Sequence, residues 1–288
     1  MISVYKREMK SYFSTVVGYI SIALMIAVTG IFVRLYCFTG GYPKFEAVLP
    51  NSAIVLMLAV PLITMRTFAE ERRQKTDLLL YSLPLTTGQI VAGKYLATVT
   101  VLAIPCGLMG LIPIILSFYG TVNLGSAYAG LLAYFLLSCA MAAICMFMSA
   151  LTESQVIAAV LGIGTLFLIY ISSMISSAVP ITAIASFIAL TVAVLLLGVV
   201  VYLLTKDYWI AFTVAVVIEA VLVIIYITNG SVYTGLFQNV VGEASLFVRL
   251  GDFVTNELFD MTTIVYYGSV AALFCYLTGV VFEKRRYN

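Results

Sequence analysis

Residues 95–152 read YLATVTVLAIPCGLMGLIPIILSFYGTVNLGSAYAGLLAYFLLSCAMAAICMFMSALT, without one charged side chain. A helix that crosses the hydrocarbon core of a bilayer needs about 20 apolar residues. The run is therefore long enough for two spans, separated by a turn at Tyr119–Ser126. Strands of a transmembrane barrel would alternate apolar and polar residues instead. The stretch predicts an all-α, polytopic helical membrane protein.

The composition of the whole chain indicates the same class. Of its 288 residues, 63% are hydrophobic and 10% are charged, whereas soluble domains carry about a quarter charged residues. We expect a single transmembrane domain, 1–288, with Pro61, Pro105 and Pro113 as bends. A six-span fold, with 155–228 folded differently, is the alternative to eight spans. The eight expected spans are at about 15–36, 51–68, 90–118, 127–151, 155–177, 181–204, 209–227 and 261–282.

The basic residues predict the orientation of the spans. Eight spans place both termini on one side, and twelve of the 15 basic residues then lie on that side. Lys and Arg are enriched in cytosolic loops, so we expect both termini and the loop at 70–88 to be cytosolic. The twelve are Lys6, Arg7, Lys10, Arg66, Arg72, Arg73, Lys75, Lys94, Lys206, Lys284, Arg285 and Arg286; Arg34, Lys44 and Arg249 lie opposite.

Two segments outside the spans have an amphipathic pattern. In residues 1–14 apolar residues recur at helical spacing and basic residues group on the other side, which predicts a helix lying in the membrane interface. An ordinary basic flank that only fixes orientation is the alternative. Residues 229–260 form a longer, mildly amphipathic extracytosolic segment.

Several kinds of chemistry are excluded by residue type. The chain has no histidine, which removes a histidine general base and imidazole metal ligands. Its five cysteines are odd in number and lack the spacing of a metal site, so we interpret them as packing thiols. No Gly-rich phosphate loop occurs, and no basic surface suits nucleic acid. We therefore expect neither an enzyme nor a metal site.

A dense block of charge, EERRQKTDLLLYSLP at residues 70–84, interrupts the apolar pattern. Thr76 is a plausible N-cap of a short helix, Asp77 suits its first turn, and Pro84 ends it. The residues between them give this cytosolic helix an apolar surface that must contact something. The residues alone leave open whether it contacts the membrane, another part of the chain or a partner protein.

The block and its continuation resemble the signature of ABC-2 type permeases. The usual form is E-E-[KR]-x-x-x-T-[LID]-x-x-L-x-x-x-P-[LIV]-[ST], followed by I-[LV]-x-[GA]-K, which residues 70–86 and 90–94 match. The C-terminal stretch at 252–286 is similar to the end of the gliding-motility and nitrous-oxide-maturation branch of that family.

The resemblance implies one transmembrane subunit of an ATP-binding cassette transporter. Two permeases, identical or different, would work with two separate cytosolic ATPases, which bind the ATP and Mg²⁺; this chain would hold no cofactor. It implies a bacterial-type plasma membrane, an elbow helix at 1–14, and export or lipid-side handling of a substrate. A smaller contact is expected at Thr152–Ser154. The residues it places at the ATPase are Glu70, Glu71, Arg72, Arg73, Thr76, Asp77, Leu78, Leu79, Leu80, Tyr81 and Ser82.

Glu219 is a second candidate site, near the middle of the seventh span. An ionised carboxylate there costs several kcal/mol unless it is paired or hydrated. One interpretation is a proton, cation or substrate site, which leads to the alternative function of an ion-coupled secondary transporter. The other is a hydrogen-bonded contact between helices, with Tyr226 or a serine of another span as the partner.

Overall fold

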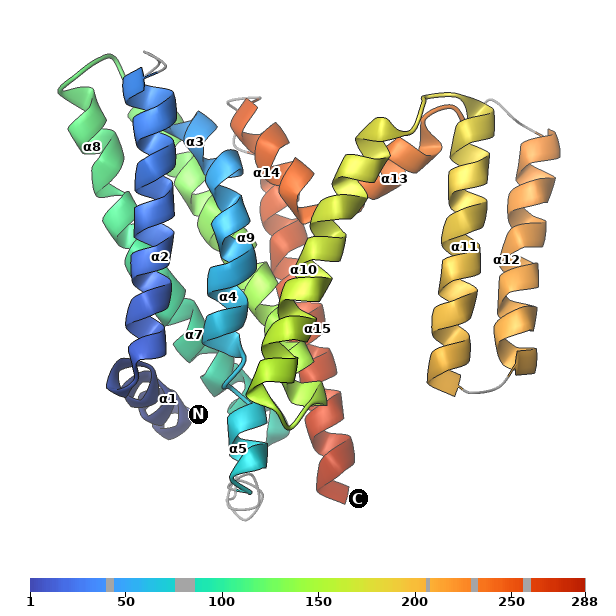
Figure 1. Cartoon of the computed structure of the whole chain (residues 1–288), viewed down its shortest axis with the longest axis horizontal. Helices are drawn as coiled ribbons and strands as arrows, with labels where there is room; N and C mark the ends of the chain where they lie inside the picture. Colours follow the sequence, from blue (N-terminus) through green and yellow to red (C-terminus); the bar gives the residue numbers. More distant parts are fainter. Residues whose placement is uncertain (40–43, 76–85, 206–207, 229–232, 256–259, 288) are drawn as a thin grey trace. The chain divides into compact units, whose positions relative to one another are not determined.

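The computed structural model describes the chain except residues 40–43, 76–85, 206–207, 229–232, 256–259 and 288. The described residues are almost entirely helical and include no strand (Figure 1). They divide into two compact units, one of Met1–Leu168 with Arg249–Asn288 and one of Ile169–Val248. Two of the expected spans, at about 181–204 and 209–227, fall in the second unit.

The first unit begins with a short amphipathic helix and continues with long apolar ones. Its elements as far as the charged block are α1 (Ile2–Ser14), α2 (Val16–Val33), a π-helical turn (Arg34–Thr39), α3 (Phe45–Ser52), a 3₁₀ turn (Ala53–Val55), α4 (Leu56–Thr64) and α5 (Ala69–Arg73). Those after the block are α7 (Thr87–Met109), α8 (Leu111–Ser117), α9 (Leu124–Leu151), most of α10 (Gln155–Ala178), most of α14 (Leu246–Thr255) and α15 (Met261–Tyr287).

Helix α9 forms the centre of the first unit. It contacts α4, α7 and α15, and α15 packs along it (Figure 1). Its small residues Ala133, Ala140 and Ala143 are buried, and Tyr134 and Met146 are fully buried. Small side chains let helix backbones approach closely within a membrane. The sequence of α9 therefore suits it to a central position.

The second unit is built on a helical hairpin. Helices α11 (Ala183–Thr205) and α12 (Tyr208–Thr228) pack against each other, and the short α13 (Leu236–Ala244) follows. Tyr233 stacks edge-on against Phe187, with ring centroids 5.8 Å apart, and its hydroxyl donates to the Leu222 carbonyl at 2.7 Å. This aromatic contact ties the chain after α12 back to the hairpin.

Six helical segments of the described residues are long and apolar enough to cross a membrane. They are Val16–Thr39, Phe45–Arg73, Thr87–Ser117, Leu124–Leu151, Gln155–Ser172 and Met261–Lys284. Helices α11 and α12 coincide with the two remaining expected spans, and their described apolar parts, Ala183–Val192 and Val216–Thr228, are shorter. The prediction of a polytopic helical membrane protein is confirmed; a total of eight spans stays a prediction.

Two details differ from the expectation. The second span begins at Phe45 instead of Asn51, because the buried Glu46 falls in the first turn of a helix, where a carboxylate is favoured. Within the third span the break between α7 and α8 is at Gly110, while α7 runs through Pro105. Pro113 removes the hydrogen bond to the carbonyl four residues earlier, Met109, and so accounts for that position.

Candidate functional site

The turn that leads into α5 is fixed by one serine of α9. The Ser149 hydroxyl donates to the Met65 carbonyl at 3.1 Å, and it accepts from the backbone N–H groups of Phe68 and Ala69 at 3.3 and 3.2 Å. The first N–H groups of a helix have no partner within the helix. Ser149 therefore caps α5 from a neighbouring span.

The charged residues of α5 make contacts at both ends of the helix. The Arg66 guanidinium donates two hydrogen bonds to the Glu70 carboxylate, at 2.7 and 3.0 Å. Arg72 is buried and reaches the Thr152 carbonyl at 3.5 Å. This contact joins the charged block to the turn between α9 and α10, where a smaller contact with the ATPase is expected from the sequence.

A buried lysine of α7 is the centre of the site. Lys94 is 1% exposed, and its ammonium lies 2.9 Å from carboxylate oxygens of both Glu8 and Glu71. It also donates to the Thr67 carbonyl at 2.6 Å and lies 5.1 Å from the centre of the Phe68 ring. One side chain thus connects α1, the turn before α5, α5 itself and α7.

Helix α1 lies closely against α7 next to this lysine. A Cβ atom added at Gly93 would come within 3.1 Å of the Met1 carbonyl oxygen and 3.3 Å of the Val4 side chain. The Tyr12 hydroxyl shares a hydrogen bond of 3.1 Å with Thr98, one turn further along α7. Glycine at position 93 is needed for this close approach.

The four charged groups of Glu8, Glu71, Lys94 and Arg7 stabilise one another. Burial alone would raise the pKa of the Glu8 carboxyl, but the Lys94 ammonium and the Arg7 guanidinium outweigh burial and lower this pKa. Burial would lower the pKa of Arg7, and the carboxylates of Glu71 and Glu8 raise it above its ordinary value. The Glu8 carboxylate and the Arg7 guanidinium are therefore held in their charged forms. We call the four groups, with Thr67, the Lys94 cluster.

A polar cavity of about 330 Å³ opens beside the Lys94 cluster. Its walls come from α1 and from the segment that joins α4 to α5, and they carry charges of both signs. Among its lining residues are Arg7, Ser11, Arg66, Glu70 and Gln74. The guanidinium groups of Arg7 and Arg66 already contact carboxylates. We therefore interpret the cavity as the open edge of the Lys94 cluster and not as a separate binding site.

The structure describes only part of the predicted coupling residues. Glu70, Glu71, Arg72 and Arg73 lie on α5, and all but Arg73 have the contacts given above. Lys75, with φ of 54°, has the left-handed conformation that commonly ends a helix. The remaining predicted residues, Thr76, Asp77, Leu78, Leu79, Leu80, Tyr81 and Ser82, lie outside the described residues.

Sequence reasoning missed three residues of this site: Glu8, Lys94 and Ser149. Lys94 was recognised as part of a motif and as one of the basic residues of the cytosolic side, although its charge within the span expected at about 90–118 was a usable signal. No comparable signal marked Glu8, which stands beside basic neighbours at the start of the chain. Ser149 resembled any small polar residue of a membrane helix.

Glu219 lies in the second unit and contacts the other helix of the hairpin. The Thr191 hydroxyl of α11 donates to one Glu219 carboxylate oxygen at 2.9 Å. The other oxygen is buried and has no hydrogen-bond partner among the described residues. A contact between helices was one of the two interpretations, but the partner is a threonine instead of Tyr226 or a serine. Its functional role stays a prediction.

Comparison with known families identifies the chain at the level of a family. The family described as ABC-2 family transporter protein matches residues 22–206, about two thirds of the 288 residues. No curated protein matches the chain. The C-terminal stretch that resembles the gliding-motility and nitrous-oxide-maturation branch lies beyond the matched residues, so that branch is not supported by the match. With six apolar, membrane-length helical segments among its described residues, this multi-pass membrane protein belongs to the ABC-2 transporter family.

Proposed function

We propose that the chain is the permease subunit of an ATP-binding cassette transporter in a bacterial-type plasma membrane. Two such subunits, identical or different, pair and move a substrate, with export or lipid-side handling as the expected direction. Separate cytosolic ATPases bind ATP and Mg²⁺ and supply the energy. Residues 70–82 transmit their motion to the spans. Membership of the ABC-2 family supports this class of function.

The Lys94 cluster is the observation that carries the proposal for this chain. In the sequence, the segment 76–85 follows α5 and precedes α7, whose first residue is Thr87. The cluster joins those same two helices to each other and to α1. A force applied to the segment from the cytosol therefore acts on three elements that are already connected by buried ion pairs.

A hydrophobic core beneath the cluster extends that connection to other spans. Phe68, Ile90, Met146 and Phe282 share one buried group, with the rings of Phe68 and Phe282 5.6 Å apart. These residues come from the turn before α5 and from α7, α9 and α15. Displacement of the charged block would thus reach the central helix of the first unit by direct packing.

The alternative function, ion-coupled transport through Glu219, is not favoured. Family membership indicates a permease that works with an ATPase, and the Thr191 hydrogen bond gives Glu219 a structural role in the α11–α12 hairpin. Replacement by Gln would preserve that hydrogen bond. Transport that persists in Glu219→Gln is therefore the outcome we expect.

Orientation is the first point to test. We expect a cysteine introduced at Gln74, in a variant without the five native cysteines, to react with a membrane-impermeant maleimide only after the cells are permeabilised. The control is a cysteine at Tyr119, 75% exposed in the turn between α8 and α9, which should react in intact cells. Labelling of Gln74→Cys from outside would invert the topology and end the proposal.

The ATPase contact is tested by co-purification. Replacing Leu79 and Tyr81 by Glu should abolish recovery of a cytosolic ATPase with the tagged chain, since charges would replace the apolar contact surface. The matched control is Leu79→Met with Tyr81→Phe, which keeps that surface and should retain the ATPase. Full recovery and transport in the Glu variant would count against the role of residues 76–82.

A further inference from the structure

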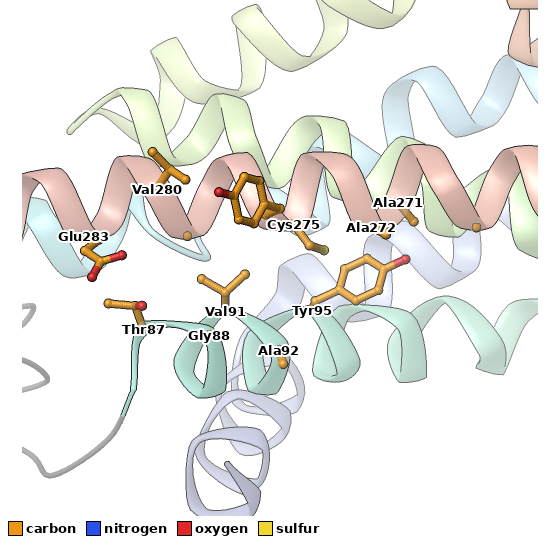
Figure 2. Close-up of a pocket in the computed structure, with 13 residues that line it drawn as sticks. Thr87, Gly88, Val91, Ala92, Tyr95, Ala271, Ala272, Cys275, Val280 and Glu283 are labelled. Carbon is orange, nitrogen blue, oxygen red and sulfur yellow. The ribbon is translucent and has the colours of Figure 1, made fainter.

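A groove of about 630 Å³ runs between α7 and α15 in the first unit (Figure 2). Its α7 wall is formed by Thr87, Gly88, Val91, Ala92 and Tyr95. Most of its α15 wall consists of small residues at helical spacing, from Gly268 through Ala271, Ala272 and Cys275 to Gly279. Both helices have the length and apolar character of membrane spans, so the groove lies along the hydrocarbon of the bilayer.

The carboxylate of the groove lies at one end. Figure 2 shows Thr87 and Glu283 facing each other from α7 and α15 at that end, and Tyr95 with Ala271 and Ala272 toward the other. The Tyr95 hydroxyl donates to the Cys139 carbonyl at 3.1 Å, so its polar atom is already bonded to α9. The groove is therefore mainly apolar, with Tyr276 on its α15 wall, and it has a carboxylate at the end where α7 begins and α15 ends.

Its dimensions suit an acyl chain better than a helix. From Gly268 to Glu283 the wall rises over fifteen residues, about 22 Å at 1.5 Å per residue. At roughly 30 Å³ per methylene, about the volume of a water molecule, a chain of about 16–18 carbons fills roughly 500 Å³. A helix of that length and about 10 Å diameter needs roughly 1,700 Å³.

We propose that this groove binds one phospholipid with a primary-amine headgroup, such as phosphatidylethanolamine. The acyl chain lies between α7 and α15, and the ammonium group contacts the Glu283 carboxylate. A primary ammonium donates hydrogen bonds to a carboxylate. The quaternary ammonium of phosphatidylcholine has no N–H group and cannot donate one. The next residue, Lys284, is exposed and complements the phosphate of the same headgroup.

The site is distinct from the ATPase contact but lies close to it. Val91 belongs to the buried group that contains Phe68, and Cys275 packs against that group. The floor of the groove is thus the outer face of the core beneath the Lys94 cluster. In the orientation proposed above, the headgroup would lie in the cytosolic leaflet, and this part of the inference rests on the proposed function. Binding of the lipid depends neither on the orientation nor on the ATPase.

Native mass spectrometry of the full-length protein in detergent tests the proposal. The protein is titrated with phosphatidylethanolamine, phosphatidylcholine and phosphatidylglycerol of identical acyl chains. We expect one tightly bound lipid, with phosphatidylethanolamine preferred about two- to fivefold over phosphatidylcholine, the range of an exposed ion pair. Glu283→Gln should remove this preference and leave binding of a lipid intact. Tighter binding of phosphatidylglycerol, unchanged in Glu283→Gln, would overturn the headgroup assignment.

The location is tested by filling the groove. A Cβ atom added at Gly279 meets no atom within 4 Å, so Gly279→Phe occupies the groove without displacing the protein, and we expect at least tenfold weaker lipid binding. Gly164→Phe is the matched control, because a Cβ there also meets nothing and Gly164 lies on α10. Equal binding by the two variants would refute the site.

A second measurement keeps the test decisive if Gly279→Phe does not fold. Phosphatidylethanolamine with a diazirine on its acyl chain is crosslinked to the wild-type protein, and the adducts are mapped. Adducts on peptides of α7 and α15 that include groove residues support the proposal. Adducts confined to other helices contradict it. Neither result changes the expected co-purification with an ATPase. The lipid site and the ATPase contact can therefore be refuted independently.

Discussion

The Lys94 ammonium lies 2.9 Å from the Glu8 carboxylate, although 86 residues separate them in the chain. The pair joins the amphipathic N-terminal helix to the third span, and Glu71 completes it from α5. An ammonium held away from water is stabilised only by such partners. Two further contacts support this arrangement: Ser149 caps α5, and Gly93 lets α1 approach α7 closely.

Removal of the buried ammonium should destabilise the protein strongly. Lys94→Met leaves the carboxylates of Glu8 and Glu71 partly buried beside Arg7 alone, and loss of one partner from a buried ion pair costs about 3–5 kcal/mol. We expect a lower midpoint of unfolding in detergent. Lys6→Met, at an exposed position of α1, is the matched control and should lie within about 0.5 kcal/mol of wild type.

The double variant separates loss of charge balance from loss of packing. Adding Glu8→Gln to Lys94→Met removes one of the two carboxylates that have lost the lysine and share Arg7, so part of the stability should return. If Lys94→Met were as stable as Lys6→Met, the Lys94 cluster would not hold α1 and α5 to α7.

Removal of the Ser149 hydroxyl should loosen α5. In Ser149→Ala the N–H groups of Phe68 and Ala69 lose their acceptor, and we expect a loss of about 1 kcal/mol, the cost of an unmet hydrogen bond. Ser138→Ala is the control, because the hydroxyl of that buried serine of α9 donates to the Phe135 carbonyl of its own helix. Equal thermal midpoints for the two variants would show that the cap contributes nothing.

Stability should depend on acid pH through Glu8. Its pKa is lower in the folded protein than the value of about 4.3 for an unfolded chain. The ionised carboxylate therefore contributes stability that is fully present above pH 4.3 and is lost as the pH falls through the folded-state pKa. We expect the difference in midpoint between wild type and Glu8→Gln to be constant from pH 7 to 5 and to shrink below. A difference that grew on acidification would reverse the sign of the interaction.

Gly93 should be far more sensitive to substitution than Gly88 of the same helix. In Gly93→Ala the new methyl group is forced against the Met1 carbonyl and Val4, so α1 must move away; at Gly88 it meets no atom within 4 Å. We expect trypsin to cleave α1 at Lys6 or Lys10 faster in Gly93→Ala only. Equal cleavage rates would mean that α1 does not depend on this close approach.

The helices of this protein were predictable because membrane spans are encoded locally. Long apolar runs and short polar breaks placed the helices within a few residues, and Pro113 marked the region of the break between α7 and α8. The start of the second span was misplaced: it was expected at Asn51, which left Glu46 outside the helix that begins at Phe45. A carboxylate in the first turn of a helix can be buried. The sequence pattern does not distinguish such a carboxylate from one in a polar loop.

The candidate site was predictable only in part, for a different reason. The charged block was visible as a departure from an apolar background, and its residues on α5 make the contacts described above. Pairing of Glu8 with Lys94 and capping of α5 by Ser149 are contacts across 80 or more residues. Such contacts depend on how the spans pack, which neither composition nor periodicity records. The division of the chain at Leu168 and Arg249 was likewise absent from the pattern.

The burial of the Lys94 ammonium limits how the end of the first unit that contains α1 and α5 can deform. Attraction between unit charges in a medium of effective dielectric about 20 changes by about 1–2 kcal/mol when 3 Å becomes 4 Å, and the lysine has two such partners. Gradual sliding of one helix past another is therefore resisted from the first ångström. Under load, α1, α5 and the start of α7 should swing as a rigid body, and the bending should occur where helices are interrupted, as at Gly110.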